Sequence, residues 1–213
     1  MKVIRKFRQL LNSYLAKAYV AWAETHIFRD EPAKALKKCA RALALNPHMV
    51  DAYVQRGRAH YRLSAYAEAL VDYEAALSLA PKNASLFINR GLVHYALGNS
   101  DEAVGDFNWA IYLDPRQPLA YYHRGLTDEA LGNYLGAIAD YTQAITLNPH
   151  LAVCYANRAR VRILHGDLTG ALRDLRHYLA LATGLINSER ATIEKTMADL
   201  VGQLGGETST STA

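Results

Sequence analysis

The chain is poor in cysteine, proline and glycine, and it has no long apolar run. Its 213 residues include two cysteines, six prolines and 13 glycines. Cys39 and Cys154 lie far apart and form no Cys-x-x-Cys, so we expect two small buried hydrophobes rather than a disulfide framework or a metal site. No stretch reaches the ~20 apolar residues of a transmembrane helix. Because hydrophobic residues still make up 51% of the chain, with Leu and Ala dominant, the composition favours an all-α fold.

Sequence motifs for catalysis, cofactor binding and secretion are also missing. The chain has no Gly-x-Ser-x-Gly, no His-Glu-x-x-His, no P-loop and no Gly-x-Gly-x-x-Gly. We therefore predict that the protein is not an enzyme and uses no cofactor, no metal ion and no small-molecule substrate. The basic start is not followed by the uninterrupted apolar segment of a signal peptide, which predicts a cytoplasmic location.

Positive charge is concentrated near the start of the chain. The whole chain carries a formal net charge of +4, yet residues 1–47 alone hold ten Lys and Arg against three acidic residues. This asymmetry indicates an acidic partner or an anionic surface near that end, unless the charges only solvate a helix face. Residues 1–15 have apolar residues at helical spacing and are predicted to form a basic amphipathic helical extension. Its candidate contacts with an anionic surface are Lys2, Arg5, Lys6 and Arg8.

Several kinds of residue recur at an interval of 34. Similar sequence segments end with a proline at Pro47, Pro81, Pro115 and Pro149. An aromatic column contains Tyr19, Tyr53, Phe87, Tyr121 and Tyr155. A small-residue column contains Ala23, Gly57, Gly91, Gly125 and Ala159. An unbroken alanine column contains Ala35, Ala69, Ala103, Ala137 and Ala171, and a second, mostly aromatic column follows it by four residues at Cys39, Tyr73, Phe107, Tyr141 and Leu175.

This order of aromatic, small residue, alanine, aromatic and proline resembles the tetratricopeptide repeat over about residues 16–183. The resemblance implies an all-α, right-handed solenoid of five helix–turn–helix repeats, because stacking buries the apolar face that one hairpin cannot bury alone. We expect the repeats at residues 16–49, 50–83, 84–117, 118–151 and 152–183. Residues 1–15 form the N-terminal extension, residues 187–204 read as a capping helix, and residues 205–213 as a flexible tail.

Charged columns share the same period. The arginines are Arg56, Arg90, Arg124 and Arg158, and the aspartates are Asp72, Asp106, Asp140 and Asp174. Within a repeat the two are 16 residues apart and equidistant from the turn, so antiparallel helices place them level with one another. We interpret them as a structural ion-pair ladder rather than a ligand site. The first repeat departs from this pattern because it has Trp22 and Lys38 in those places.

A further column contains His26, His60 and His94, followed by Asp128 and Arg162. Packed helices lie about 8–10 Å apart, whereas zinc ligands lie ~2 Å from the metal. Equivalent residues in adjacent repeats are therefore poorly placed to share a metal ion. We expect these histidines to replace a packing aromatic of the family.

In the family that the repeats resemble, the first helix of each repeat lines the concave face. The candidate peptide-binding residues on that face are Gln55, Arg58, Tyr61, Asn89, Leu92, Tyr95, Tyr122, His123, Leu126, Glu129, Asn157 and Arg160. One column of this face, formed by Gln55, Asn89, His123 and Asn157, can donate and accept hydrogen bonds to the backbone of an extended peptide. The other interpretation is that these side chains only solvate the face or bond to neighbouring helices.

These observations predict a non-catalytic scaffold that binds another protein or a peptide in its groove. The lysines that grip a terminal carboxylate in the chaperone-binding members of the family are missing, so that function is not assigned. The alternative is a peripheral adaptor attached to an anionic membrane or to nucleic acid through the basic N-terminal helix. Helical repeats that read RNA call for a more uniformly basic groove than this one.

Overall fold

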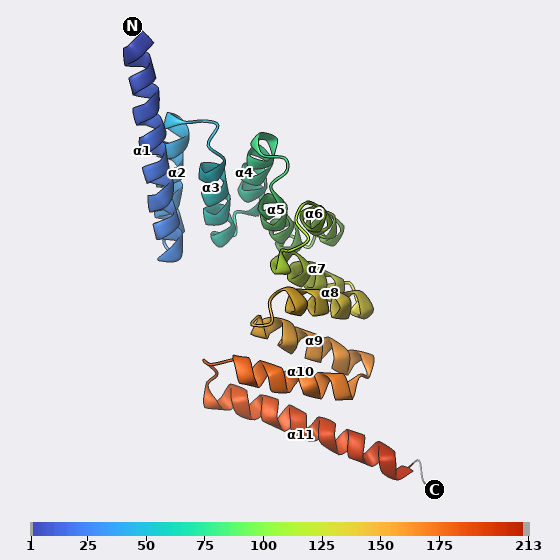
Figure 1. Cartoon of the computed structure of the whole chain (residues 1–213). Helices are drawn as coiled ribbons and strands as arrows, with labels where there is room; N and C mark the ends of the chain where they lie inside the picture. Colours follow the sequence, from blue (N-terminus) through green and yellow to red (C-terminus); the bar gives the residue numbers. More distant parts are fainter. Residues whose placement is uncertain (1, 211–213) are drawn as a thin grey trace. The chain divides into compact units, whose positions relative to one another are not determined.

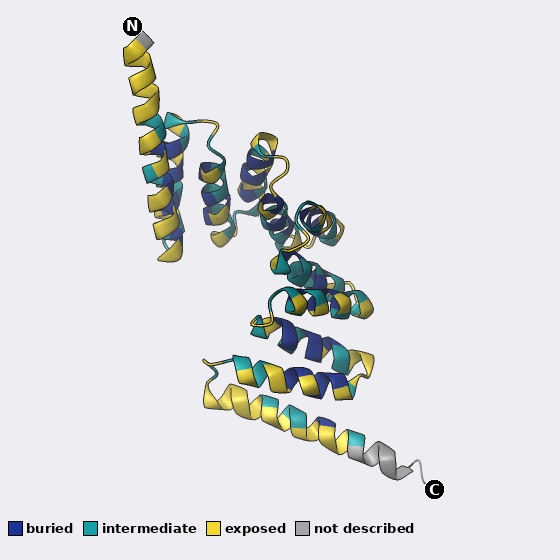
Figure 2. Cartoon of the chain, viewed as in Figure 1, coloured by how far each residue is buried: buried dark blue, intermediate teal, exposed yellow. Residues whose placement is uncertain are grey.

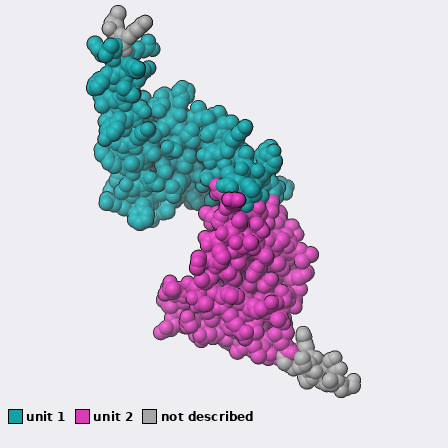
Figure 3. Space-filling model, viewed as in Figure 1, with its two compact units in different colours: residues 1–115 teal, residues 116–213 magenta. Residues whose placement is uncertain are grey.

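The computed structural model describes the backbone of residues 2–210 and the side chains of residues 3–204. The described residues form eleven α-helices and no strand (Figure 1), which confirms the predicted all-α class. Within this part of the chain, no helix has both the length and the apolar content needed to cross a membrane. The chain divides into two compact units, Met1–Pro115 and Arg116–Ala213 (Figure 3).

Unit 1, Met1–Pro115, contains three helical hairpins. Their helices are α1 (Lys2–Phe28) with α2 (Pro32–Leu45), α3 (Val50–Arg62) with α4 (Tyr66–Leu79), and α5 (Ala84–Ala96) with α6 (Ser100–Leu113). Unit 2, Arg116–Ala213, contains two hairpins and a final helix. Its helices are α7 (Pro118–Ala130) with α8 (Tyr134–Leu147), α9 (Ala152–His165) with α10 (Leu168–Leu181), and α11 (Asn187–Thr210).

Each hairpin turns through one residue with a left-handed backbone. These residues are Asp30, Ser64, Gly98, Gly132 and Gly166, all with φ between 57° and 85°. Glycine adopts this conformation without a Cβ clash, and Asp and Ser adopt it less readily. The turns therefore keep the 34-residue period, as the sequence predicts, although the first two have no glycine.

The alanine column lies at the centre of the hairpins. All five of its alanines are fully buried (Figure 2). The facing small-residue column lets the aromatic side chains of the second helix approach the first. A Cβ added to Gly91, for example, would lie 2.8 Å from the ring of Phe107. Small residues on one helix and large ones on the other thus pack closely together.

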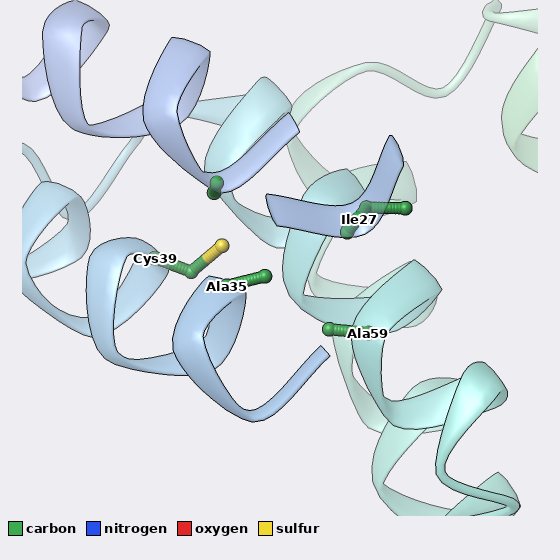
Figure 4. Packing of buried hydrophobic residues seen from close by; sticks show 5 residues of the cluster. Ile27, Ala35, Cys39 and Ala59 are labelled. Carbon is green, nitrogen blue, oxygen red and sulfur yellow. The ribbon is translucent and has the colours of Figure 1, made fainter. Parts of the chain in front are cut away.

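Both cysteines are buried, as predicted. Cys39 packs with Ile27, Ala35 and Ala59 in a cluster between α1, α2 and α3 (Figure 4). Burial raises the pKa of the Cys39 thiol to about 12 and that of Cys154 to about 11. Both thiols are therefore protonated at neutral pH and act as small apolar groups.

The predicted Arg–Asp ladder is confirmed in four hairpins. In the third, Arg90 donates from Nε and Nη2 to Asp106 at 2.9 and 2.7 Å. The corresponding pairs are Arg56–Asp72, Arg124–Asp140 and Arg158–Asp174. All four aspartates are buried, so each needs its arginine to offset the lost hydration. The first hairpin uses a cation–π contact instead, with Lys38 Nζ 4.8 Å from the centre of the Trp22 ring.

The two end helices extend the repeats. Helix α1 is continuous from Lys2 to Phe28. Helix α11 packs Leu200 against Ala171 and Leu175 of α10, with the partly buried Met197 beside them. It continues to Thr210, so residues 205–210 are helical rather than part of the expected tail, and residues 211–213 lie outside the described residues. Extending an existing helix adds one hydrogen bond per residue without a new nucleation step, so polar and glycine residues can still follow.

Candidate functional site

An open pocket lies where the first helices of the second and third hairpins meet in unit 1. Its volume is about 380 Å³. Side chains from α3, α4 and α5 surround it, namely Arg58, Tyr61, Arg62, Tyr73, Asn89 and Leu92. Four of these six are residues that the sequence places on the predicted peptide-binding face. Arg62 and Tyr73 were not predicted.

The polar groups of this pocket remain largely available. Arg58 is exposed, and its Nη1 donates a long bond of 3.3 Å to Gln55. Asn89 is half-buried, and the structure records no hydrogen bond for its amide within the described residues. Gln55 is only 8% exposed and so lies beneath the surface as a support for Arg58. Arg62 donates to Asp30 at 2.8 Å, in a surface pair that solvent weakens.

Aromatic and aliphatic side chains form the walls. The rings of Tyr61 and Tyr66 pack with their centres 5.5 Å apart. Burial raises the pKa of Tyr61, which keeps its hydroxyl protonated and able to donate. Leu92 lies on the adjoining helix α5, and Tyr95, one turn further along, is 37% exposed. This face therefore offers apolar side chains, some of which end in a tyrosine hydroxyl, beside the two arginines Arg58 and Arg62.

The equivalent positions in unit 2 are occupied by an ion pair. Residues 68 positions further along the chain, two repeats on, are Leu126, Glu129, Ala130, Tyr141, Asn157 and Arg160. Arg160 forms a bidentate ion pair with Glu129, in which Nη2 donates a hydrogen bond of 2.9 Å. The hydroxyl of Tyr141 donates to the same carboxylate at 3.0 Å. The Glu129 side chain is only 8% exposed, so this network closes the position that is open in unit 1.

The remaining predicted residues of unit 2 are also engaged internally. The Asn157 amide donates to the hydroxyl of Tyr122 at 3.3 Å and accepts a weak bond of 3.4 Å from Arg160. The ring of His123 lies edge-on to that of Tyr122, 5.0 Å away. Burial lowers the pKa of His123 to about 4, so it is neutral at physiological pH. Leu126 is partly buried against the Tyr141 cluster.

The polar column has two different arrangements in one chain. In unit 1 Asn89 borders a pocket, whereas in unit 2 Asn157 bonds to Tyr122 of the neighbouring helix α7 and to Arg160 of its own helix. Arg62 lies one helical turn beyond Arg58, so its place on the same face of α3 could have been predicted from this spacing. Tyr141 was assigned to the packing column only, although its equivalent in the preceding repeat, Phe107, has no hydroxyl and so cannot form this bond.

Similarity to known proteins agrees with this architecture. Two tetratricopeptide repeat profiles match residues 23–86 and 88–152. A search with the chain finds no match among curated proteins. Among solved structures, PilF of Pseudomonas aeruginosa is 17% identical over 93% of this chain and 89% of its own, with a TM-score of 0.81. PilW, a type IV pilus biogenesis factor, is 19% identical over 88% of this chain and 86% of its own, with a TM-score of 0.78.

YrrB, a tetratricopeptide repeat protein with an unusual peptide-binding site, is 21% identical over 82% of this chain and 90% of its own, with a TM-score of 0.62. At these identities the likeness shows the fold alone.

Proposed function

The chain belongs to the tetratricopeptide repeat family, whose repeats mediate protein–protein interaction, and we propose that its unit 1 binds an extended, acidic segment of a partner protein. The proposed contact surface is the face of α3 and α5 around the pocket. The observation that carries the proposal is the combination of an available amide, Asn89, with the exposed guanidinium of Arg58 at one concave position.

The chemistry of the pocket suits an extended peptide. Such a peptide presents unpaired backbone N–H and C=O groups, and the Asn89 amide can bond to both kinds. Arg58 and Arg62 favour a carboxylate side chain at the same place, since a guanidinium binds a carboxylate through two parallel hydrogen bonds. Tyr61, Leu92 and Tyr95 supply apolar contact beside this anchor.

Unit 2 has a different part in the proposal. Glu129, Asn157 and Arg160 already bond to one another or to their neighbours, so a peptide would have to break these bonds before using them. We therefore assign these three residues to the stability of unit 2. Tyr122, His123 and Leu126 stay candidates for apolar contact only.

The test selects binding peptides from a displayed library of acidic, neutral and basic sequences and measures their affinities for variants by fluorescence anisotropy. Asn89→Ala removes one hydrogen bond and is expected to weaken binding by about 0.5–1.5 kcal/mol. Arg58→Ala removes a charge-assisted bond and is expected to weaken it by about 1.5–3 kcal/mol.

Asn157→Ala is the matched control, because it deletes the equivalent amide two repeats on. The proposal predicts that it leaves peptide affinity unchanged and lowers only the stability of unit 2. Equal losses from Asn89→Ala and Asn157→Ala would show that the peptide uses both units. Library selection that enriches basic rather than acidic peptides would contradict the assigned role of the arginines.

Two further predictions concern catalysis and cellular location. The tetratricopeptide repeat fold is generally a non-catalytic scaffold, and the proposal needs no reaction at the pocket. The cytoplasmic location predicted from the sequence stays a prediction, and the similarity to PilF and PilW gives a reason to test it directly by fractionation.

A further inference from the structure

The beginning of helix α1 carries an exposed apolar stripe. Five large apolar side chains are between 64 and 81% exposed, namely Val3, Ile4, Phe7, Leu10 and Tyr14. Among the described residues of α1, the first that is buried is Ala16. Figure 2 shows α1 extending beyond the end of α2, with mostly exposed residues in this part of the helix. This part of the helix therefore leaves an unusual amount of apolar surface uncovered.

The stripe is not a continuation of the face that packs in the core. At about 100° per residue, the apolar side chains of residues 3–15 fall within an arc of about 140°. The buried residues of α1 are Ala16, Val20, Ala23 and Ile27. On the same helical projection they lie about half a turn away from that arc. Helix α1 is thus amphipathic at both ends, but with opposite faces apolar.

Basic side chains flank the stripe. Arg5, Lys6 and Arg8 are all exposed, and Lys6 and Arg8 lie at the two edges of the apolar arc. The first acidic residue of the chain is Glu24, more than two turns beyond the stripe. A helix with an apolar face bordered by cations is suited to lie in the interface of a membrane, its apolar side chains among the lipids and its cations at the headgroups.

We propose that residues 3–15 of α1 bind the surface of an anionic membrane, with the stripe facing the lipid. Nucleic acid is a poorer fit, because phosphates would neutralise the cations but leave Val3, Ile4 and Leu10 in water. A second copy of the chain is also a poorer fit. Packing two stripes together would bring the flanking cations of both helices close to one another, without an acidic residue before Glu24 to offset them.

The test measures partitioning of the whole chain onto sedimented vesicles of phosphatidylcholine, alone or mixed with phosphatidylglycerol. Binding is expected only to the anionic vesicles and is expected to fall as salt is raised. The charge variant Arg5→Glu with Lys6→Glu and Arg8→Glu should weaken partitioning by about a hundredfold or more. The apolar variant Phe7→Ser with Leu10→Ser should weaken it by about tenfold or more.

Matched controls lie in unit 2. Arg173, Arg176 and Lys195 are exposed, so changing all three to Glu gives the same change in net charge away from α1. Leu135→Ser with Leu164→Ser removes two other exposed leucines. Both controls should partition within about twofold of the unmodified chain. Far-UV circular dichroism should be unchanged in every variant.

Four results would overturn the proposal. The first is an unmodified chain that does not bind anionic vesicles at low salt. The second is an apolar variant that binds them as well as the unmodified chain does, since the lipid contact would then be electrostatic only. The third is a dimer in sedimentation equilibrium that the apolar variant dissociates, together with no vesicle binding, which would assign the stripe to self-association. The fourth is an oligonucleotide that binds the unmodified chain more tightly than the vesicles do and that only the charge variant fails to bind, which would assign the cations to nucleic acid instead.

Discussion

Units 1 and 2 present different surfaces at equivalent positions of the repeat. In unit 1 an open pocket lies beside Arg58 and Asn89. In unit 2 the position equivalent to Tyr61 is Glu129, and the position equivalent to Leu92 is Arg160. These two side chains bond across the gap between α7 and α9. The change of two residues to oppositely charged side chains thus places a partly exposed ion pair where unit 1 has a pocket, without changing the hairpins.

This difference separates two uses of the same helix face. The columns that face the core are nearly constant along the chain, because packing tolerates little change in volume. The face away from the core is free to vary, and there each unit has a different arrangement. Affinity for a peptide and stability of the stack are therefore expected to respond to different substitutions in the two units.

The largest expected effect concerns the ladder. In unit 2 Asp174 accepts from Arg158 at 2.7 and 2.9 Å and from Arg162 at 2.8 Å. Asp174→Asn leaves two guanidinium groups against a neutral amide and should lower the free energy of unfolding by about 3–5 kcal/mol. The equivalent change in unit 1, Asp72→Asn, should lower it by only about 1–3 kcal/mol, since the single arginine there, Arg56, is more exposed and can be hydrated.

Urea denaturation followed by circular dichroism measures both. Because the chain consists of two units, each transition should be fitted separately where two are visible. Equal losses for the two variants would mean that the extra arginine in unit 2 adds nothing to the ladder.

Protonation of His123 provides a test specific to unit 2. Burial lowers the pKa of this side chain to about 4, whereas in the unfolded chain it titrates near about 6.5. Between these values the unfolded state binds more protons than the folded state, so stability is lost as pH falls from about 6.5 to about 4. The loss from this group should amount to about 2–3 kcal/mol.

His123→Gln, which copies Gln55 of the second repeat, should flatten the pH dependence of stability in that window. His165→Gln serves as the control, because it makes the same substitution at an exposed position. Identical slopes for the unmodified chain and His123→Gln, measured by urea titration at a series of pH values, would contradict the neutral, buried state.

Exchanging the residues of the two units tests the comparison most directly. Leu126→Arg, Glu129→Tyr and Arg160→Leu place the residues of unit 1 in unit 2. We expect this triple variant to bind a second molecule of an acidic peptide selected with the unmodified chain, which calorimetry would report as a doubled stoichiometry. The converse variant, Arg58→Leu, Tyr61→Glu and Leu92→Arg, should close the pocket and weaken the first site by about 1.5–3 kcal/mol, which is about ten- to a hundredfold.

A stoichiometry of one peptide in the triple variant would show that these three positions do not suffice to make a pocket. Unchanged affinity in the converse variant would show that the peptide does not use the pocket of unit 1.

Much of the fold was predictable from spacing, and less of the site. The hairpins and the Arg–Asp pairs follow from columns 34 and 16 residues apart, because antiparallel helices of fixed rise bring such positions level. The closed state of unit 2 was not predictable in this way. It depends on the hydroxyl of Tyr141, which reaches Glu129 from another helix. Because Tyr141 belongs to a column of packing residues, its place in the repeat provides no reason to expect that hydrogen bond. Likewise, Trp22 and Lys38 replace the Arg–Asp pair in the first repeat, yet these two side chains still contact one another across the hairpin.

The smallest expected effect, and the only gain in stability, concerns an unsatisfied oxygen in unit 1. Asp72 Oδ1 accepts both bonds from Arg56. Its Oδ2 is buried with no hydrogen-bond partner among the described residues, and His60 Nε2 lies 3.8 Å away, too far for a hydrogen bond. In unit 2 the position equivalent to His60 is Arg162, three repeats on, which donates to the corresponding oxygen of Asp174 at 2.8 Å.

His60→Arg should therefore supply the missing donor and raise the free energy of unfolding by about 0.5–1.5 kcal/mol. The gain should be present in urea denaturation at neutral pH and should disappear when Asp72→Asn is added, because the charged acceptor is then gone. His60→Leu is the control for side-chain packing without a donor, and it should give no gain. If Arg and Leu at this position stabilise the chain equally, the effect comes from apolar contact. The unsatisfied oxygen of Asp72 would then not be what distinguishes the ladder of unit 1 from that of unit 2.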